Sequence, residues 1–179
     1  MKTYFTSDTH AWHTNIINYC QRPFVNGGEM TKALADNINK TVSSGDTLYH
    51  LGDFAFGQEL RIRGFREMIN CNNVHLILGN HDKTIRKNTE LHNLFVSVSD
   101  IKQVLLNKIK IILCHYAMRV WNASFHGSWH LYGHSHGTLI ENPKSLSFDV
   151  GVDCWDYKPV SFEQVVEKMT RKINEKVEI

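Results

Sequence analysis

The sequence has few cysteines, no long apolar run and no excess of charge, and each shortage excludes a class of protein. The four cysteines lie at least 40 residues apart, so there is no Cys-x-x-Cys pair for a zinc knuckle or a thioredoxin-like redox site. No stretch approaches the roughly 18 apolar residues that a membrane helix needs. Lys plus Arg number 20 against 18 for Asp plus Glu, a balance that excludes a protein holding nucleic acid mainly through its phosphates.

The remaining composition is that of an ordinary globular protein. The chain has 179 residues, of which 42% are hydrophobic and 21% charged, enough for a core without disulfide staples. No linker, repeat or low-complexity tract interrupts it, so we expect a single domain over residues 1–179. The N-terminal segment has no apolar run of signal-peptide length, and isolated cysteines suit a reducing compartment. We therefore expect a cytoplasmic protein.

Strand-like and helix-like segments alternate along the first half of the chain. Short apolar runs, typical of buried strands, occur at residues 3–6, 47–51, 74–78, 109–114 and 130–132. Helical spacing of apolar residues occurs at 30–42, at 60–69, and after a capping box formed by Ser161 and Gln164. Residues 95–115 are typical of a hairpin that turns at Asn107-Lys108. The pattern predicts a three-layer α/β sandwich with a central mixed β-sheet flanked by helices.

Histidine is the residue in surplus, with 11 in the chain. Because histidine is the commonest metal ligand and a frequent proton-transfer group, the surplus suggests a metal or acid–base site. Histidines gather with carboxylate and amide side chains where the strand-like runs end, at Asp8, His10, Asp53, Asn80, His81, Asp82, His115, His134 and His136. Strand ends in an α/β sheet converge on one edge, so these residues are expected to meet there. The glycines that precede three of them, Gly52, Gly79 and Gly133, permit sharp turns or close approach.

The number of donors indicates more than one ion. Asp8-x-His10 and His134-x-His136 are i, i+2 pairs, whose side chains point to one side in extended backbone. With the other strand-end donors they make a set of seven: Asp8, His10, Asp53, Asn80, His115, His134 and His136. A catalytic ion commonly takes three or four protein ligands, so seven suit two ions that share a bridging carboxylate. Oxygen and imidazole donors without a thiolate suit Mn, Fe, Zn, Co or Ni.

The same residues form five sequence blocks, namely Asp8-x-His10, Gly52-Asp53, Gly79-Asn80-His81-Asp82, His115 and Gly133-His134-Ser135-His136. In this order, between residues 8 and 136, the blocks closely resemble those of the calcineurin-like metallophosphoesterase superfamily. The residues around them are similar to those of its short bacterial and phage members. The resemblance implies the metallophosphoesterase fold and hydrolysis of phosphate esters.

The resemblance also implies a role for each residue. It implies two divalent transition-metal ions, with Mn favoured. The first ion would be bound by Asp8, His10 and His136, and the second by Asn80, His115 and His134. Asp53 would bridge the two ions. A hydroxide held between the ions is the expected nucleophile. His81 is expected to protonate the leaving oxygen or to stabilise the charged phosphoryl group. Asp82 is expected to orient His81 through a hydrogen bond, or else to cap the helix that follows.

Two arginines are candidate substrate-binding residues, because a guanidinium can hold a phosphate through paired hydrogen bonds. They are Arg22 and Arg119, although a solvated position is the common fate of an arginine. The irregular stretch 117–129 contains two tryptophans and a phenylalanine, which either wall the site or pack over the sheet edge.

Other polar residues have simpler interpretations. His13 and His126 are candidates for reaching substrate, whereas the pattern favours polar packing for His50, His75, His92 and His130. Asp149 and Asp153 are interpreted as structural turn residues, and the cysteines as structural thiols.

We therefore expect a binuclear metal-dependent phosphohydrolase acting on a small phosphate ester, with nucleotides among the candidate substrates. A phosphodiesterase is favoured over a phosphomonoesterase because the resemblance to the family implies it and because no additional basic cluster is present to hold a dianion. The alternatives are a phosphomonoesterase, a small nuclease, and a non-enzymatic interaction scaffold. The balanced charge argues against stable binding of duplex nucleic acid, and the complete set of ligands argues against a scaffold.

Overall fold

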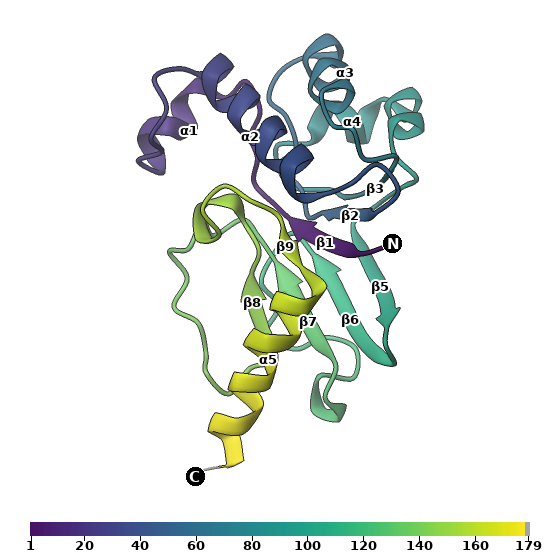
Figure 1. The fold of residues 1–179 in the computed structure, drawn as a ribbon, viewed down its shortest axis with the longest axis vertical. Coiled ribbons are helices and arrows are strands. Elements are labelled where there is room, and N and C mark those ends of the chain that lie inside the picture. The colour runs from purple at the N-terminus through teal and green to yellow at the C-terminus, as the bar shows by residue number, and fades with distance from the viewer. Residues whose placement is uncertain (178–179) are drawn as a thin grey trace.

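The computed structural model describes residues 1–177, which form two β-sheets surrounded by helices (Figure 1). The strands are β1 (Thr3–Thr6), β2 (Thr47–His50), β3 (Asn73–Ile77), β4 (Ser97–Ser99), β5 (Ile101–Leu106), β6 (Ile109–Cys114), β7 (Trp129–Tyr132), β8 (Ser147–Asp149) and β9 (Val160–Ser161). The α-helices are α1 (Thr14–Tyr19), α2 (Gly27–Thr41), α3 (Glu59–Glu67), α4 (Lys83–Lys87) and α5 (Phe162–Val177). Short 3-10 helices cover Thr89–Leu94, Ser124–His126 and Val152–Cys154.

The first sheet has the strand order β4-β3-β2-β1-β9. Strands β1 to β4 run parallel to one another, and β9 pairs antiparallel with β1 at the edge. The three apolar runs expected in this region are confirmed as β1, β2 and β3. Strand β9 was not predicted, because its two residues are too few to show an alternating pattern.

The second sheet has the strand order β5-β6-β7-β8. The expected hairpin is confirmed for β5 and β6, where Leu106 pairs with Ile109 across Asn107 and Lys108. These two turn residues have φ of 47° and 67°, which is the left-handed conformation that a two-residue hairpin turn requires. The start of the predicted hairpin is wrong, however, because β4 pairs in parallel with β3 and belongs to the first sheet. The chain therefore crosses from one sheet to the other between β4 and β5.

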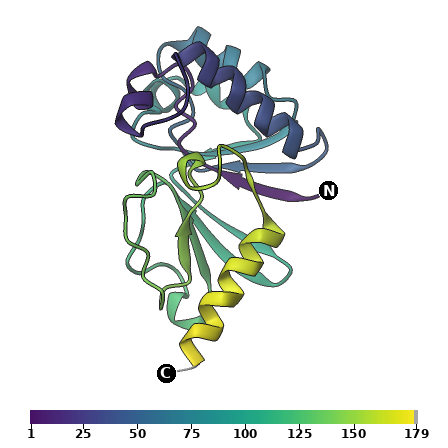
Figure 2. The same cartoon turned by 60° about the vertical axis from the view of Figure 1, so that its left-hand side comes forward.

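The two sheets and the helices form layers. Helices α1 to α4 gather on one side of the first sheet, and the second sheet and α5 lie on its other side (Figures 1 and 2). One core lies between the first sheet and the helices and includes Ile38 of α2 and Phe65 of α3. Another joins Phe5 of the first sheet to Leu131 of the second and Val165 of α5. The expected three-layer α/β architecture is confirmed.

The two long helices begin where the sequence provides caps. The Asn26 side chain accepts a hydrogen bond from the backbone N–H of Glu29 at the start of α2. The predicted capping box is present at α5, since Ser161 Oγ accepts from the N–H of Gln164 and Gln164 Oε1 accepts from the N–H of Ser161. Among residues 1–177, no helix has both the length and the apolar composition needed to cross a membrane.

Candidate metal centre

The seven predicted ligands lie at the carboxyl ends of five strands that belong to both sheets. Asp8 and His10 follow β1, Asp53 follows β2, and Asn80 follows β3. On the second sheet, His115 follows β6, and the pair His134 and His136 follows β7. The ends are joined by backbone hydrogen bonds from Asp8 N to Gly52 O at 3.0 Å, from His10 N to Asp53 O at 2.9 Å and from Gly133 N to His115 O at 2.9 Å. The strand ends therefore converge as expected.

The side chains form two compact groups. The possible ligand atoms of Asp8, His10 and His136 lie within 4.8 Å of one another, and so do those of Asp53, His115 and His134. Asn80 joins the second group, because its Oδ1 lies 3.1 Å from His115 Nε2. We call the set with Asp8 the first group and the set with His115 the second group. Each matches the ligand set that the resemblance implied for one ion.

Asp53 lies between the two groups. Its Oδ2 is 3.4 Å from His10 Nε2 in the first group and 3.5 Å from His115 Nε2 in the second. Its Oδ1 accepts a hydrogen bond of 2.8 Å from the backbone N–H of His81. One carboxylate oxygen therefore faces both groups, which is the placement that a bridging ligand needs.

Five of the seven predicted ligands have left-handed backbone. Their φ angles lie between 47° and 68°, at Asp8, His10, Asp53, His134 and His136. The argument from extended i, i+2 pairs is therefore wrong in its geometry, and in the second pair the two imidazoles go to different groups. Positive φ is uncommon for residues other than glycine, and such residues cluster at functional sites. The strained backbone of these loops thus helps to set the orientation of the candidate ligands.

The glycines before the ligands are required for close approach, as predicted. A Cβ at Gly79 would lie 2.6 Å from Asp53 N, and a Cβ at Gly133 would overlap Ser7 Oγ and Asp8 Oδ2. The N–H of His134 also donates to Asp8 Oδ2 at 2.9 Å. The first and second sheets therefore meet at this point with no room for an additional methyl group.

We expect Gly133→Ala to destabilise the protein by about 1–3 kcal/mol and to lower its metal content, because the methyl group displaces the Asp8 carboxylate. Gly64 in α3 is the matched control, since a Cβ there meets no atom within 4 Å. Gly64→Ala should stabilise the protein by about 0.5–1 kcal/mol. Urea unfolding and elemental analysis measure both effects, and equal stability and metal content in the two variants would contradict the packing argument.

The electrostatics of the groups fit divalent cations. His10 Nε2 is buried and makes no hydrogen bond with any part of the chain that the structure describes, so a polar atom in the middle of the site has no partner there. Burial raises the pKa of Asp8 to about 7, because the charges of His115 and His136 do not fully offset the loss of solvent around its carboxylate. Burial lowers the pKa of His10, which favours the neutral, ligating form of the imidazole. Burial alone would raise the pKa of Asp53, but the hydrogen bond and charge of His115, together with the charge of His10 and the hydrogen bond from the His81 backbone, lower that pKa.

His81 lies at the open side of the site. Its side chain is exposed, and its ring centroid is 5.1 Å from that of His10 and 5.7 Å from that of His13. Asp82 does not hydrogen-bond the His81 side chain, nor does its side chain cap α4. Its buried carboxylate instead accepts from the backbone N–H groups of Gly79 and Asp53 at 2.8 Å and of Phe54 at 3.0 Å. The prediction for Asp82 is therefore corrected: it holds the loop that carries Asp53.

Arg22 lies buried beneath the site and is not available to bind substrate. Its side chain is fully buried, and it forms a two-bond ion pair with Asp153, from Nε at 2.8 Å and from Nη2 at 2.7 Å. It also donates to the backbone carbonyls of Asp8 at 2.7 Å and Thr9 at 3.1 Å. Because the guanidinium is occupied by these partners, the expectation that Arg22 grips a substrate phosphate is corrected. It holds the loop of the first group in place.

Asp153 is a functional residue that the sequence interpretation missed. Its Oδ2 lies 2.7 Å from His136 Nδ1, which leaves His136 Nε2 for the first group. A carboxylate that accepts from the second nitrogen of a ligating histidine fixes the orientation of the ring. Asp149 has the structural role predicted for it, since it accepts from the Ser135 hydroxyl and from the N–H of Gly151.

We expect Asp153→Asn to weaken binding of the first ion about 10- to 100-fold, because His136 loses the charged acceptor that orients it. Asp156→Asn is the control, since Asp156 is three residues away and its side chain is 82% exposed. Equilibrium dialysis with Mn measures the affinity, and circular dichroism confirms that the variant remains folded at the temperature used. Unchanged affinity in a folded Asp153→Asn protein would show that Asp153 does not position the ligand.

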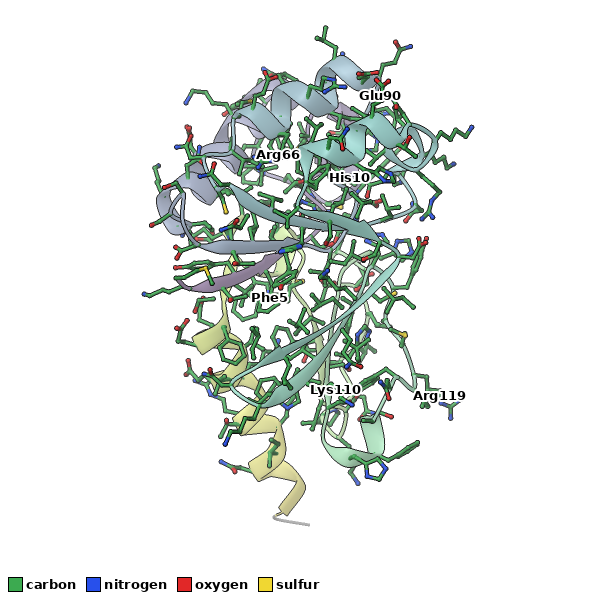
Figure 3. All side chains as sticks on the ribbon, turned by 90° about the vertical axis from the view of Figure 1, so that its right-hand side faces the viewer. Phe5, His10, Arg66, Glu90, Lys110 and Arg119 are labelled. Carbon is green, nitrogen blue, oxygen red and sulfur yellow. The ribbon has the colours of Figure 1, made fainter. Side chains whose placement is uncertain are left out.

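The other predicted substrate residues lie elsewhere. Arg119 is exposed and points outward at the far end of the second sheet from His10 (Figure 3), so its expected contact with substrate is corrected. Trp121 and Trp129 are buried in the core between the sheets and do not wall the site. His126 is exposed and lines a hollow with Lys108 and Lys110 at the hairpin turn.

His13 is the remaining histidine that joins the site. It is buried, and its Nδ1 lies 3.4 Å from His10 Nδ1. The predicted packing role is confirmed for four others, each of which has a hydrogen-bond partner within the fold: His50, His75, His92 and His130.

Comparison with known proteins identifies the family. The profile of the calcineurin-like phosphoesterase superfamily domain matches residues 1–154. An uncharacterized protein of Methanocaldococcus jannaschii is 34% identical over 97% of both chains. A protein of unknown function from Aquifex aeolicus has the same fold, with a TM-score of 0.72 and 24% identity over 93% of this chain and 98% of that one. A structure of an archaeal phosphodiesterase has a TM-score of 0.50 and 22% identity over 84% of each chain.

The two-sheet fold and the histidine–carboxylate site define a metal-dependent hydrolase of phosphate esters. The chain belongs to the calcineurin-like phosphoesterase superfamily. Membership implies divalent metal ions, and the two groups of side chains are the candidate sites for them.

Proposed function

We propose that the protein is a binuclear phosphohydrolase that favours phosphodiesters and works with Mn. The position of Asp53 carries this proposal, because one carboxylate oxygen lies within 3.5 Å of a histidine nitrogen from each group. The archaeal phosphodiesterase with a similar fold supports the choice of diester. Four free cysteines suit a cytoplasmic location, which we propose as well.

The residues divide between two ions. Asp8, His10 and His136 would hold the first, Asn80, His115 and His134 would hold the second, and Asp53 would be shared. When bound, the two ions would supply a hydroxide nucleophile at neutral pH and positive charge for the phosphoryl oxygens. The chain contributes the geometry, because Asp82 fixes the loop of Asp53 and Asp153 fixes the ring of His136.

His81 acts on the substrate itself. Its exposed ring lies beside His10, where it can approach an oxygen of a phosphate ester bound at the two groups. As the new phosphorus–oxygen bond forms and the ester bond breaks, the leaving oxygen takes a proton from the His81 side chain and departs as an alcohol. In the phosphorane-like transition state the same ring stabilises negative charge on the phosphoryl group.

The test is hydrolysis of two chromogenic esters by the Mn-loaded protein. We expect bis-p-nitrophenyl phosphate, a diester, to be hydrolysed with a higher kcat/KM than the monoester p-nitrophenyl phosphate. Preference for the monoester would reassign the protein as a phosphomonoesterase. No hydrolysis of either ester by protein that contains two ions per chain would overturn the proposal.

A further inference from the structure

Two partly exposed aromatic side chains flank the metal centre, one beside each group. Phe56 is 40% exposed and Tyr116 is 46% exposed. Phe56 lies beside His13 and His81, next to the first group, whereas Tyr116 lies against His115 and His134 of the second group. The mechanism described above uses neither ring.

The Phe56 ring is held in a fixed plane. It stacks on His13 with a centroid distance of 4.1 Å and an angle of 11° between the planes. His13 is itself buried and lies against His10. The backbone N–H of Phe56 donates to the carbonyl of Ala11 at 2.8 Å, which ties the residue to the loop after β1. The imidazole thus supports one side of the Phe56 ring, which remains partly open to solvent.

The Phe56 ring is also close enough to His81 to contact a base attached to a phosphate at the site. Its centroid is 6.1 Å from that of His81, the residue that we assign to the leaving oxygen. A ring that is fixed, partly exposed and close to a phosphate site is a stacking surface for a planar group linked to that phosphate. Every nucleobase has such a flat face, and stacking needs no particular pattern of hydrogen bonds.

We propose that Phe56 stacks on a nucleobase of the substrate, so that the preferred substrates are nucleotide phosphodiesters. The inference rests on the proposed function, since it requires the phosphate to bind at the two groups. Tyr116 lies beside the second group. Its ring is edge-on to those of His115 and His134, with centroid distances of 5.0 Å and 4.9 Å. The two substituents of a phosphodiester could thus lie on the two sides of the metal centre, one beside Phe56 and the other beside Tyr116. The base would belong to the substituent beside Phe56.

The experiment compares binding of adenosine 5′-monophosphate with binding of ribose 5-phosphate to the Mn-loaded protein by calorimetry. The two ligands share the phosphate and the ribose and differ in the base. We expect the wild-type protein to bind the adenine nucleotide about 10- to 100-fold more tightly. Phe56→Ala and Phe56→Leu should remove most of that ratio, whereas Phe56→Trp should retain it. The leucine variant keeps an apolar cover over His13 and lacks only the aromatic face.

Phe125→Ala is the matched control, because Phe125 is 85% exposed and lies on the 117–129 loop away from the site. It should leave the ratio unchanged. Equal affinity of the two ligands in the wild type, or a ratio that Phe56→Ala does not change, would overturn the proposal. Hydrolysis of bis-p-nitrophenyl phosphate by the same wild-type preparation reports on the proposed function separately, so a failure of one is distinguishable from a failure of the other.

Discussion

Asp53→Asn is expected to lower kcat at least about a thousandfold, because the two ions lose the charged ligand that they share. The Asn side chain keeps the shape of Asp53 but not its negative charge, and only one oxygen remains to accept from the N–H of His81 or to face the two groups. Metal content should fall from two ions per chain to one or fewer. Mass spectrometry of the dialysed protein and steady-state kinetics at saturating Mn measure the two effects.

Asp36→Asn is the control for this substitution. Asp36 lies on α2 with its side chain 45% exposed, and its carboxylate pairs with Lys32, so its loss should change neither kcat nor metal content. If Asp53→Asn retained two ions and turned over substrate at the wild-type rate, Asp53 would not be the bridging ligand.

His81→Ala is expected to have the second largest effect, a loss of about a hundredfold in kcat with both ions retained. The side chain is exposed and belongs to neither group, while the His81 backbone N–H that holds Asp53 Oδ1 survives the substitution. A fall in kcat without a fall in metal content is therefore the result that identifies the role of His81. His126→Ala, on an exposed histidine beside Lys108, should behave as the wild type.

If His81→Ala lost metal and activity together, His81 would be a metal ligand and not a residue that acts on the substrate. Full activity with the metals retained would remove it from the reaction. A substrate with a good leaving group, such as p-nitrophenolate, should be less sensitive to the variant than an alkyl ester, because the better leaving oxygen needs its proton less.

The sequence predicts where the candidate ligands gather, because each one follows a strand. The end of a strand is visible as a change from apolar to polar residues, and parallel strands bring such ends together whatever their separation in the chain. Asp8 and His134 are 126 residues apart, yet the N–H of His134 donates to the Asp8 carboxylate. The short strands β8 and β9 were not predicted, because so few residues show no periodicity. Strand β4 was predicted within the hairpin 95–115, but it pairs with β3 instead.

The residues that support the ligands could not be assigned from the sequence. Arg22 and Asp153 are 131 residues apart and meet in a buried ion pair that no local pattern announces. The Asp82 carboxylate accepts three backbone N–H groups, which are contacts that any loop can offer and that only the folded chain specifies. The left-handed φ angles of Asp8 and His10 likewise depend on how the β1 loop packs against the β2 loop.

The central claim is that the two groups hold two metal ions that share Asp53. Anomalous diffraction from Mn-soaked crystals tests it most directly, since it locates each ion without reference to activity. We predict two peaks about 3.5–4 Å apart, one among Asp8, His10 and His136 and one among Asn80, His115 and His134, with Asp53 between them. A single peak, or a second peak away from the second group, would contradict the account.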